Sequence, residues 1–416
     1  MRILMLTVGG SHEPLVRSIQ DTRPDEIVFL CSRESSVVVA GEGKVNKSNR
    51  ALPSPDLPAV PVLLNLDKDR YSVTILTDCD DLSSCYLESS DALRSSLAKH
   101  AGADVIVDYT GGTKTLTAAL AMAGCDEPRC RLQLVVGRRP DLQQVQSSTE
   151  FAVPVEVYRL RAERGFATAE QILRTYAYGA AAAFLRESAA AFAAPGLRDR
   201  FQQRIQFCEA MDAWDRFDHE AARDRMRGLP GLEPYSQWLG LTLSGKGHGF
   251  ELVEDLVLNA ERRASQGRYD DAFGRLYRAV ELTAQKRLSA VHQIDTGNVD
   301  CGRLPEPIGA KMASKRSANG KVQVGLVDAW EILASLEDSS IVQRYRTVSD
   351  RLKTFLTVRN SSLFAHGDRP VTKVDADKWV PLVASFLRHC VESAARDHKG
   401  PTAGPLAQLP TAWPET

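Results

Sequence analysis

The first 160 residues contain five short, almost uninterrupted apolar runs, separated by stretches with the periodicity of helices. These runs are rich in β-branched residues and cover residues 2–8, 26–32, 73–77, 104–110 and 131–137. A strand that is covered on both faces has no polar side, so its sequence is continuously apolar. The alternation of such strands with helices therefore predicts a doubly wound, mostly parallel α/β sheet.

The rest of the chain lacks this strand signal and has the pattern of Ala-rich amphipathic helices. We expect an amino-terminal Rossmann-like domain over residues 1–160, a helical connector over 161–247 and a helical carboxyl-terminal domain over 248–398. Residues 399–416 contain four prolines and are expected to form a disordered tail. Further prolines interrupt the α/β pattern over residues 41–61, which indicates an exposed loop or insertion.

The nearly equal numbers of basic and acidic residues limit the kinds of partner that the chain can bind. The chain has 416 residues, with 52 Lys and Arg against 53 Asp and Glu, and a formal net charge of -1. This balance excludes a strongly basic protein that coats nucleic acid, so any contact with an anion must be local. No apolar run is long enough to span a membrane and no signal peptide is evident, so we expect a cytoplasmic protein.

The cysteines and histidines do not form a known metal-binding pattern. The eight cysteines include no CxxC pair, and the sequence has no HExxH motif. We therefore expect reduced thiols and no structural or catalytic metal.

Two glycine turns follow predicted strands, which is where open α/β sheets bind their ligands. After the first strand come Gly9, Gly10, Ser11 and His12, and between the fourth strand and a helix come Thr110, Gly111, Gly112, Thr113 and Lys114. Glycine lets the backbone approach a ligand, and a helix amino terminus offers donors to an anion. Either pair alone is also compatible with a simple tight turn. The spacing fits neither a Walker A loop nor a GxGxxG fingerprint.

A second candidate site lies near the end of the chain. Residues 339–366 have the pattern of one long helix, on which one face carries Leu352, Phe355, Arg359, Ser362 and His366. On a regular helix, His366 would lie about 10.5 Å beyond Arg359 along the axis. This stripe either leaves the core at the helix end or supplies a functional Arg–His pair.

These motifs resemble a known family. The TGGTK turn after a strand, together with Gly-Gly-Ser after the first strand, resembles the CARF domain of CRISPR-associated proteins. The segment from Arg359 to His366 resembles the Arg-polar-x(4 to 6)-His motif of HEPN ribonucleases. In this order, the two resemble the CARF–HEPN ancillary ribonucleases of type III CRISPR antiviral defence, over nearly the whole chain.

The resemblance implies a cyclic oligoadenylate as the activator, held between two paired CARF domains of a homodimer. The first expectation is cyclic tetra-adenylate and the second is hexa-adenylate. The expected ligand-binding residues are those of the two turns, with Ser32 at the rim of the pocket. We expect His12 either to contact an adenine or to be exposed at the start of a helix.

The resemblance also implies metal-independent cleavage of single-stranded RNA by attack of a ribose 2'-hydroxyl. Arg359 would bind the scissile phosphate, His366 would act as general acid or base, and Asn360 would orient Arg359 or the RNA. Ser362 would contact the RNA. One helix supplies a single Arg and a single His, so a complete site is expected between two protomers.

Two alternatives remain open at this point. One is a sensor of cyclic oligoadenylate whose helical domain binds a partner or nucleic acid without catalysis. The other adds ring-nuclease activity to the CARF domain, with Thr110, Thr113 and Lys114 assisting degradation of the activator.

Overall fold

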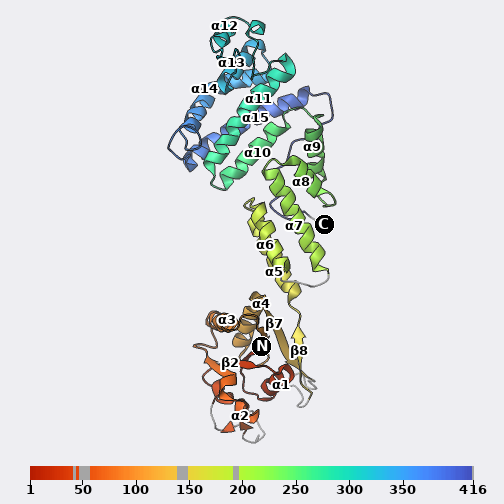
Figure 1. The fold of residues 1–416 in the computed structure, drawn as a ribbon, viewed down its shortest axis with the longest axis vertical. Coiled ribbons are helices and arrows are strands. Elements are labelled where there is room, and N and C mark those ends of the chain that lie inside the picture. The colour runs from red at the N-terminus through yellow and green to blue at the C-terminus, as the bar shows by residue number, and fades with distance from the viewer. Residues whose placement is uncertain (41–43, 46–56, 138–148, 191–195, 415–416) are drawn as a thin grey trace. The chain divides into compact units, whose positions relative to one another are not determined.

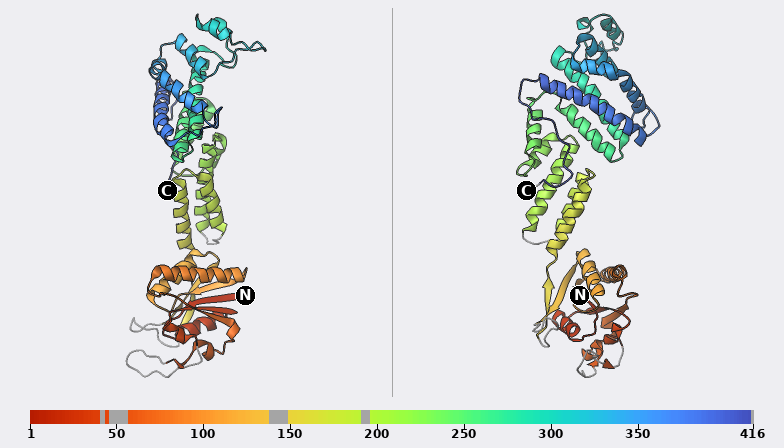
Figure 2. Two further views of the ribbon diagram at one scale, coloured as in Figure 1. Left: turned by 90° about the vertical axis from the view of Figure 1, so that its left-hand side faces the viewer. Right: turned by 180° about the vertical axis from the view of Figure 1, so that it is seen from behind.

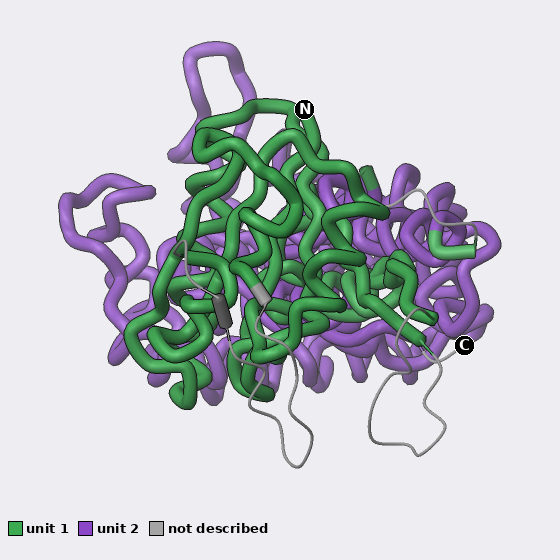
Figure 3. Tube along the Cα trace, turned by 90° about the horizontal axis from the view of Figure 1, so that it is seen from below, with its two compact units in different colours: residues 1–165, 190–197 green, residues 166–189, 198–416 purple. Residues whose placement is uncertain are grey.

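The computed structural model describes residues 1–40, 44–45, 57–137, 149–190 and 196–414. The chain divides into two compact units, which Figure 3 shows in different colours. The first unit comprises Met1–Gly165 and Ala190–Leu197, and the second comprises Phe166–Ala189 and Arg198–Thr416.

Within the described residues, the first unit is built on a six-stranded sheet with the order β5-β2-β1-β6-β7-β8. The strands are β1 (Arg2–Thr7), β2 (Glu26–Cys31), β5 (Tyr71–Ile75), β6 (Asp104–Asp108), β7 (Cys130–Val136) and β8 (Phe151–Val155). β8 pairs antiparallel with β7, and the other pairs are parallel. The predicted mostly parallel sheet is confirmed. The sequence does not predict β8, because its Pro154 argues against a strand except at a sheet edge.

The remaining elements of this unit connect the strands. They are α1 (Glu13–Thr22), α2 (Val60–Leu63), α3 (Leu82–Lys99) and α4 (Lys114–Asp126), the short 3-10 helices η1 (Ser35–Val38) and η2 (Lys68–Arg70), and a small antiparallel pair, β3 (Lys44–Val45) and β4 (Leu57–Pro58). Most of the predicted insertion over residues 41–61 lies outside the described residues.

Helices cover both faces of the sheet (Figures 1 and 2). On one face, α3 and α4 pack against Ile3 and Met5 of β1. On the other face, α1 packs against Leu4 and Leu6 of the same strand. Successive strand residues point to opposite faces, so β1 contributes to both cores. This two-sided burial accounts for the continuously apolar strand sequences.

Helix α5 (Tyr158–Leu173) begins in the first unit and ends in the second. Its Arg161 is buried and donates hydrogen bonds to the carbonyl oxygens of Gly124, Cys125 and Glu127 at 2.7, 2.9 and 2.8 Å. Carbonyl groups at a helix end have no partner within the helix. Arg161 therefore satisfies the end of α4 and fixes the start of α5 against it.

The second unit is helical. It continues with α6 (Tyr178–Ala190), α7 (Leu197–Asp215), α8 (His219–Met226), α9 (Glu233–Ser244), α10 (Glu251–Ser265), α11 (Tyr269–His292), η3 (Cys301–Arg303), α12 (Ile308–Ala313), α13 (Leu326–Leu336), α14 (Ser340–Asn360) and α15 (Lys373–Asp397). One apolar core joins α10, α11, α13, α14 and α15. The predicted succession of an α/β domain and helical domains is confirmed, whereas the exact domain boundaries remain a prediction.

A buried polar network joins α7 and α8 to α10. The side chain of Arg262 is fully buried, and its Nε donates to Asp215 Oδ1 at 2.8 Å. Its Nη2 lies 3.6 Å from Asp255 Oδ1, an ion pair longer than a hydrogen bond. Asp255 Oδ2 also accepts from Trp214 Nε1 at 3.0 Å and lies 2.8 Å from His219 Nε2. Because buried charges are costly unless paired, this network fixes how the helices meet.

Residues 399–414 form an extended strap, so the prediction of a disordered tail is wrong for them. Gln408 Oε1 accepts from Arg262 Nη1 at 2.5 Å, and Gln408 Nε2 donates to the carbonyl of Leu258 at 3.0 Å. Leu409 is buried. The prolines prevent regular secondary structure, but they do not prevent apolar and amide side chains from packing.

Three further features concern the class of protein. All eight cysteines lie in the described ranges and are free thiols. None of the helices that the structure describes is long and apolar enough to cross a membrane. Across the same part of the chain, no three His, Cys, Asp or Glu side chains are grouped as metal ligands would be.

Candidate functional site

The two glycine turns come together at one edge of the sheet. β1 and β6 are parallel neighbours, and each leads into one of the turns. From β1 the chain moves outward through β2 to β5, and then returns to β6 on the other side of β1. Doubly wound sheets bind ligands outside the carboxyl ends of the strands at such a reversal. The fold thus brings two motifs that are far apart in sequence to one candidate binding site.

The turns are in backbone contact with each other. A Cβ atom on Gly9 would lie 2.7 Å from the backbone nitrogen of Gly112, and one on Gly111 would lie 2.8 Å from the carbonyl oxygen of Thr7. Gly112 itself has a φ of 98°, a conformation that side chains disfavour. Packing between the turns therefore requires glycine at positions 9 and 111, and the backbone conformation favours glycine at position 112.

We predict that Gly9→Ala destabilises the first unit while Gly10→Ala is tolerated. The neighbour of Gly9 is a backbone atom, which cannot move aside by rotating, whereas a methyl group on Gly10 would have nothing within 4 Å. Overpacking of this kind costs about 1–3 kcal/mol. Urea unfolding of both variants measures the effect, and equal losses of stability would contradict the prediction.

A buried carboxylate braces the second turn. Asp108, at the end of β6, accepts hydrogen bonds from Ser18 Oγ at 2.5 Å and from Gln133 Nε2 at 3.1 Å. Its other oxygen accepts from the backbone nitrogen and the hydroxyl of Thr110, at 2.9 and 2.5 Å. Thr7 Oγ1 also donates to the carbonyl of Gly111. Asp108 is not among the site residues predicted from the sequence. An acidic residue at the end of a buried apolar strand is nevertheless a sequence feature that could have indicated it.

Thr113 and Lys114 form the start of α4. Thr113 is the N-cap residue, and its hydroxyl accepts from Leu116 N at 3.1 Å and donates to Cys79 O at 3.0 Å. Lys114 is the first helical residue and its side chain is exposed. Exposed backbone and a lysine at a helix start can hold an anion.

The other predicted ligand-binding residues differ in exposure. Gly10 and Ser11 are exposed, whereas His12 is 2% exposed and its Nε2 lies 3.1 Å from the carbonyl oxygen of Pro58. Of the two alternatives for His12, exposure at the start of a helix is therefore wrong, whereas contact with an adenine remains a prediction. Ser32 lies just after β2, where its hydroxyl accepts from the backbone nitrogen of Ser35 at 3.1 Å.

The second candidate site lies where α14 ends. The helix stops at Asn360, so the prediction of one helix over residues 339–366 is wrong for its last six residues. Ser361 Oγ donates to the Thr357 carbonyl at 2.9 Å, and Ser361 N donates to the same oxygen at 3.0 Å. Short polar side chains compete for backbone groups in this way and favour helix ends. Arg359 and His366 therefore do not share a helix face.

A tight turn nevertheless returns His366 to the end of the helix. Its backbone nitrogen donates to the carbonyl of Asn360 at 3.3 Å, and Gly367 N donates to Ser362 O at 3.2 Å. Ser362 and Arg369 are paired in an isolated bridge that closes the turn. The chain thus places residue 366 near residue 360 by folding back.

Arg359 is held in place by two neighbours. Its Cζ lies 4.3 Å from the centre of the Tyr277 ring on α11, and its Nη1 donates to Asn360 Oδ1 at 3.1 Å. Among the described residues no carboxylate forms an ion pair with Arg359, so its charge is available to an external anion. The side chain of His366 is exposed. A guanidinium and an imidazole near one helix end can bind a phosphate and transfer a proton.

Ser362 differs from its expected place. It is 4% exposed, and its backbone nitrogen donates to the Arg359 carbonyl at 3.0 Å. Because the helix has already ended, Ser362 belongs to the turn and not to a helix face shared with His366. Its observed contacts give it a part in shaping this turn.

The start of α14 is held by a partly buried carboxylate. Glu337 accepts hydrogen bonds from Ser339 Oγ at 2.6 Å and from Arg287 Nε at 3.1 Å, and it lies 3.0 Å from His292 Nε2. Ser339 is also the N-cap of α14. Burial would raise the pKa of Glu337, but the hydrogen bonds from these neighbours outweigh it and lower the pKa from 4.5.

We predict that Glu337 stabilises the second unit at neutral pH and that this contribution disappears in acid. Because the folded-state pKa lies below the unfolded value, the stabilisation is present above pH 4.5 and is lost as the pH falls through the folded-state pKa. Urea unfolding of the wild type and Glu337→Gln from pH 7 to pH 3 measures it. Glu281→Gln, which breaks a partly exposed pair with Arg278, is the matched control. A difference that does not shrink in acid would contradict the prediction.

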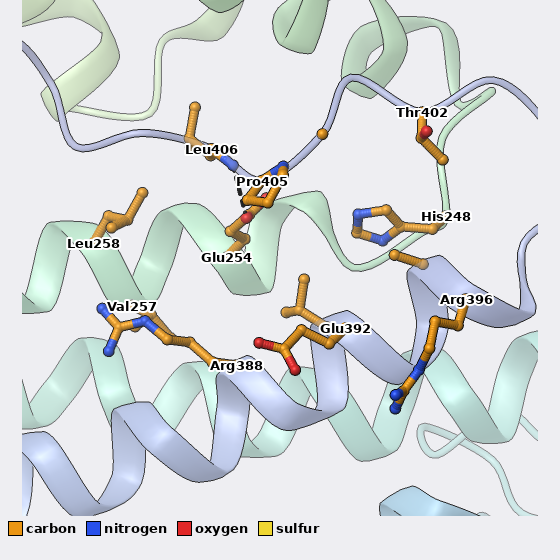
Figure 4. A pocket seen from close by; sticks show the side chains of 13 residues that line it. His248, Glu254, Val257, Leu258, Arg388, Glu392, Arg396, Thr402, Pro405 and Leu406 are labelled. Carbon is orange, nitrogen blue, oxygen red and sulfur yellow. Dashed lines mark hydrogen bonds between the residues drawn. The ribbon is translucent and has the colours of Figure 1, made fainter.

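Two cavities of the second unit differ in their distance from the candidate site. A cavity of about 360 Å³ lies between α10, α15 and the strap (Figure 4). There, Leu406 N donates to Glu254 Oε1 at 2.8 Å, and burial raises the pKa of Glu254. A smaller cavity of about 190 Å³ lies at the end of α14 and includes Ser361 and Arg369. Neither Arg359 nor His366 is among the residues that line these two cavities.

Comparison with known families finds a similarity for the carboxyl-terminal part of the chain. Residues 244–389 match the family model described as the Csm6 HEPN domain. This segment contains Arg359, Asn360 and His366. A search of the curated proteins found no match.

Solved structures match over a longer part of the chain. Csm6 from Enterococcus italicus, bound to cyclic hexa-2'-fluoro-hexa-dAMP, has a TM-score of 0.60 and 12% identity, over 95% of this chain and 93% of that chain. At this identity the likeness shows the fold alone. A protein from Vibrio cholerae, with 12% identity over 70% of each chain, has a TM-score of 0.25, which is too low to support an argument.

Proposed function

We propose that this chain belongs to the CARF–HEPN family and is an endoribonuclease switched on by a cyclic oligoadenylate. The family assignment rests on the match of residues 244–389 to the HEPN model and on the fold shared with Csm6. The observation that supports the activity is the Arg359–Asn360 pair at the end of α14, with His366 folded back to the same end. All three residues lie in the segment that matches the HEPN model.

In the proposed reaction, a ribose 2'-oxygen gives up its proton and attacks the adjacent phosphorus of single-stranded RNA. The bond from phosphorus to the 5'-oxygen of the next nucleotide breaks, and this oxygen takes up a proton. The products are a 2',3'-cyclic phosphate and a 5'-hydroxyl. Atoms and charge balance without a metal ion, which makes the proposal one of metal-independent cleavage.

Each residue has a defined part in this step. The guanidinium of Arg359 stabilises the negative charge that develops on the phosphate, and Asn360 keeps it oriented. The imidazole of His366 exchanges a proton near neutral pH. One protomer supplies one such pair, so we propose that the second pair comes from the partner in a homodimer located in the cytoplasm.

We propose that the activator binds at the glycine turns of the first unit. Backbone close to Gly9 and Gly112, with Lys114 at the start of α4, suits the phosphates of a cyclic oligoadenylate. The similar Csm6 carries a hexa-adenylate analogue, whereas the family resemblance implies tetra-adenylate first. Both rings are therefore candidates.

The proposal is tested with labelled single-stranded RNA and purified protein, with cyclic tetra-adenylate, with cyclic hexa-adenylate and without either, each with and without EDTA. We expect one ring to trigger cleavage that EDTA does not prevent and that leaves a 2',3'-cyclic phosphate. Cleavage that requires a divalent metal would overturn the mechanism. Ring binding without any RNA cleavage would favour the non-catalytic sensor.

Ring-nuclease activity is a separate hypothesis. The hydroxyl of Thr110 donates to Asp108 and that of Thr113 donates to Cys79 O, so both are engaged within the protein. This arrangement gives the hypothesis no specific support. Chromatography of the ring after long incubation with the His366→Ala variant tests it directly.

A further inference from the structure

The Arg359 side chain lies against an aromatic ring from another helix. Its Cζ is 4.3 Å from the centre of the Tyr277 ring, well within the distance of a cation–π contact. Tyr277 belongs to α11 and packs against the apolar core of the second unit. Tyr277 carries no group that takes part in the proposed reaction, so any effect on cleavage would be exerted through Arg359.

The contact between Arg359 and Tyr277 is one of two contacts between α11 and α14 that lie one turn apart on both helices. One turn earlier on both helices, Phe273 and Phe355 pack with ring centres 4.9 Å apart. Tyr277 follows Phe273 by four residues and Arg359 follows Phe355 by four, which places each on the same face as its predecessor. Phe273 and Phe355 are both fully buried, so they fix the two helices at this level. The partly buried Tyr277 ring therefore lies next to the last turn of α14.

A guanidinium that stacks on a ring keeps its hydrogen-bond donors free. The attraction acts through the flat face of the guanidinium, whereas the N–H groups point outward in its plane. Within the described part of the chain, the guanidinium also donates the hydrogen bond to Asn360. Tyr277 thus restricts the rotation of Arg359 without competing for the donors that a phosphate needs.

We propose that Tyr277 is a positioning residue for the proposed ribonuclease reaction, acting by holding the Arg359 guanidinium over the face of its ring. This inference rests on the function proposed above and adds a residue to its machinery. It requires the aromatic face of Tyr277 and not its hydroxyl.

Three variants separate an aromatic role from a structural one. Tyr277→Phe keeps the face and should retain cleavage within about twofold, whereas Tyr277→Leu should weaken RNA binding and lower kcat/KM about tenfold. Tyr345→Leu is the matched control, because Tyr345 stacks on Trp330 at 4.4 Å in the same domain. It is expected to lower stability without lowering kcat/KM of the folded protein. A loss in Tyr277→Phe equal to that in Tyr277→Leu would overturn the inference.

A double-mutant cycle tests whether Tyr277 acts through Arg359. The affinity for a non-cleavable RNA with a 2'-deoxy residue at the scissile site is measured for Tyr277→Leu in the wild-type and Arg359→Ala backgrounds. We expect weaker binding in the first and no further change in the second, because the effect needs the guanidinium. Equal changes in both backgrounds would overturn the inference while leaving the ribonuclease function intact. If the wild type neither binds nor cleaves RNA, the proposed function fails and the inference fails with it.

Discussion

RNA cleavage in the presence of the activating ring is expected to fall by about a hundredfold or more when Arg359 or His366 is replaced by alanine. Arg359→Ala removes the cation that stabilises charge on the phosphate, and His366→Ala removes the group that carries the proton. Neither side chain is needed for the core, since Arg359 is only partly buried and His366 is exposed. Single-turnover cleavage of labelled RNA at saturating ring measures both effects.

Arg351→Ala is the matched control for Arg359→Ala. Arg351 is exposed and lies earlier on the same helix, so its removal tests general loss of positive charge. Cleavage by this variant should stay within about twofold of the wild type, as expected for a surface substitution. All three variants should bind the ring as the wild type does. If both Arg359→Ala and His366→Ala cleave RNA at the wild-type rate, the active site lies elsewhere.

The free energy of unfolding of the second unit is expected to fall by about 3–5 kcal/mol in Arg262→Ala. This substitution removes the cation shared by Asp215 and Asp255, of which Asp255 is fully buried and Asp215 keeps its ion pair with Arg263. It also removes the donor to Gln408 Oε1, which ties the strap to α10. A buried charge that loses its partner costs more than the pair itself contributes. Urea unfolding followed by tryptophan fluorescence is a suitable measurement, because Trp214 donates to Asp255.

Arg388→Ala provides the comparison for this prediction. Arg388 pairs with Glu261 at 2.5 Å, but its side chain is 48% exposed. Exposed pairs contribute about 0–1 kcal/mol, so this variant should lose little stability. Equal losses in the two variants would mean that burial of Arg262 does not carry the expected penalty.

Much of the fold of the first unit could be predicted from the sequence because its strands are buried on both faces. This burial leaves a local signal, since neighbouring residues such as Leu4 and Met5 face different cores and are both apolar. The strap over residues 399–414 leaves no such signal. Its order depends on contacts such as that of Gln408 with Arg262, which are distant in the sequence. Proline content alone therefore led to the wrong expectation.

The candidate sites show the same division between local and distant causes. The glycine turns could be found because their position after a strand is a local property. The end of α14 at Asn360 was not predicted, because helical spacing continues through Ser361 and Ser362 although their side chains favour a helix end. Tyr277 and Asp108 act through partners from other elements. Ser18 and Asp108, for example, are 90 residues apart in the chain.

The end of α14 also affects how the Arg–His pair can move. Two groups on one helix keep a fixed separation, so they can only be displaced together. Here Arg359 belongs to the helix, whereas His366 belongs to a turn closed by a few backbone hydrogen bonds. The distance between the two groups can therefore change when the turn moves and the helix stays in place. It can change without repacking any of the buried aromatic side chains beneath α14.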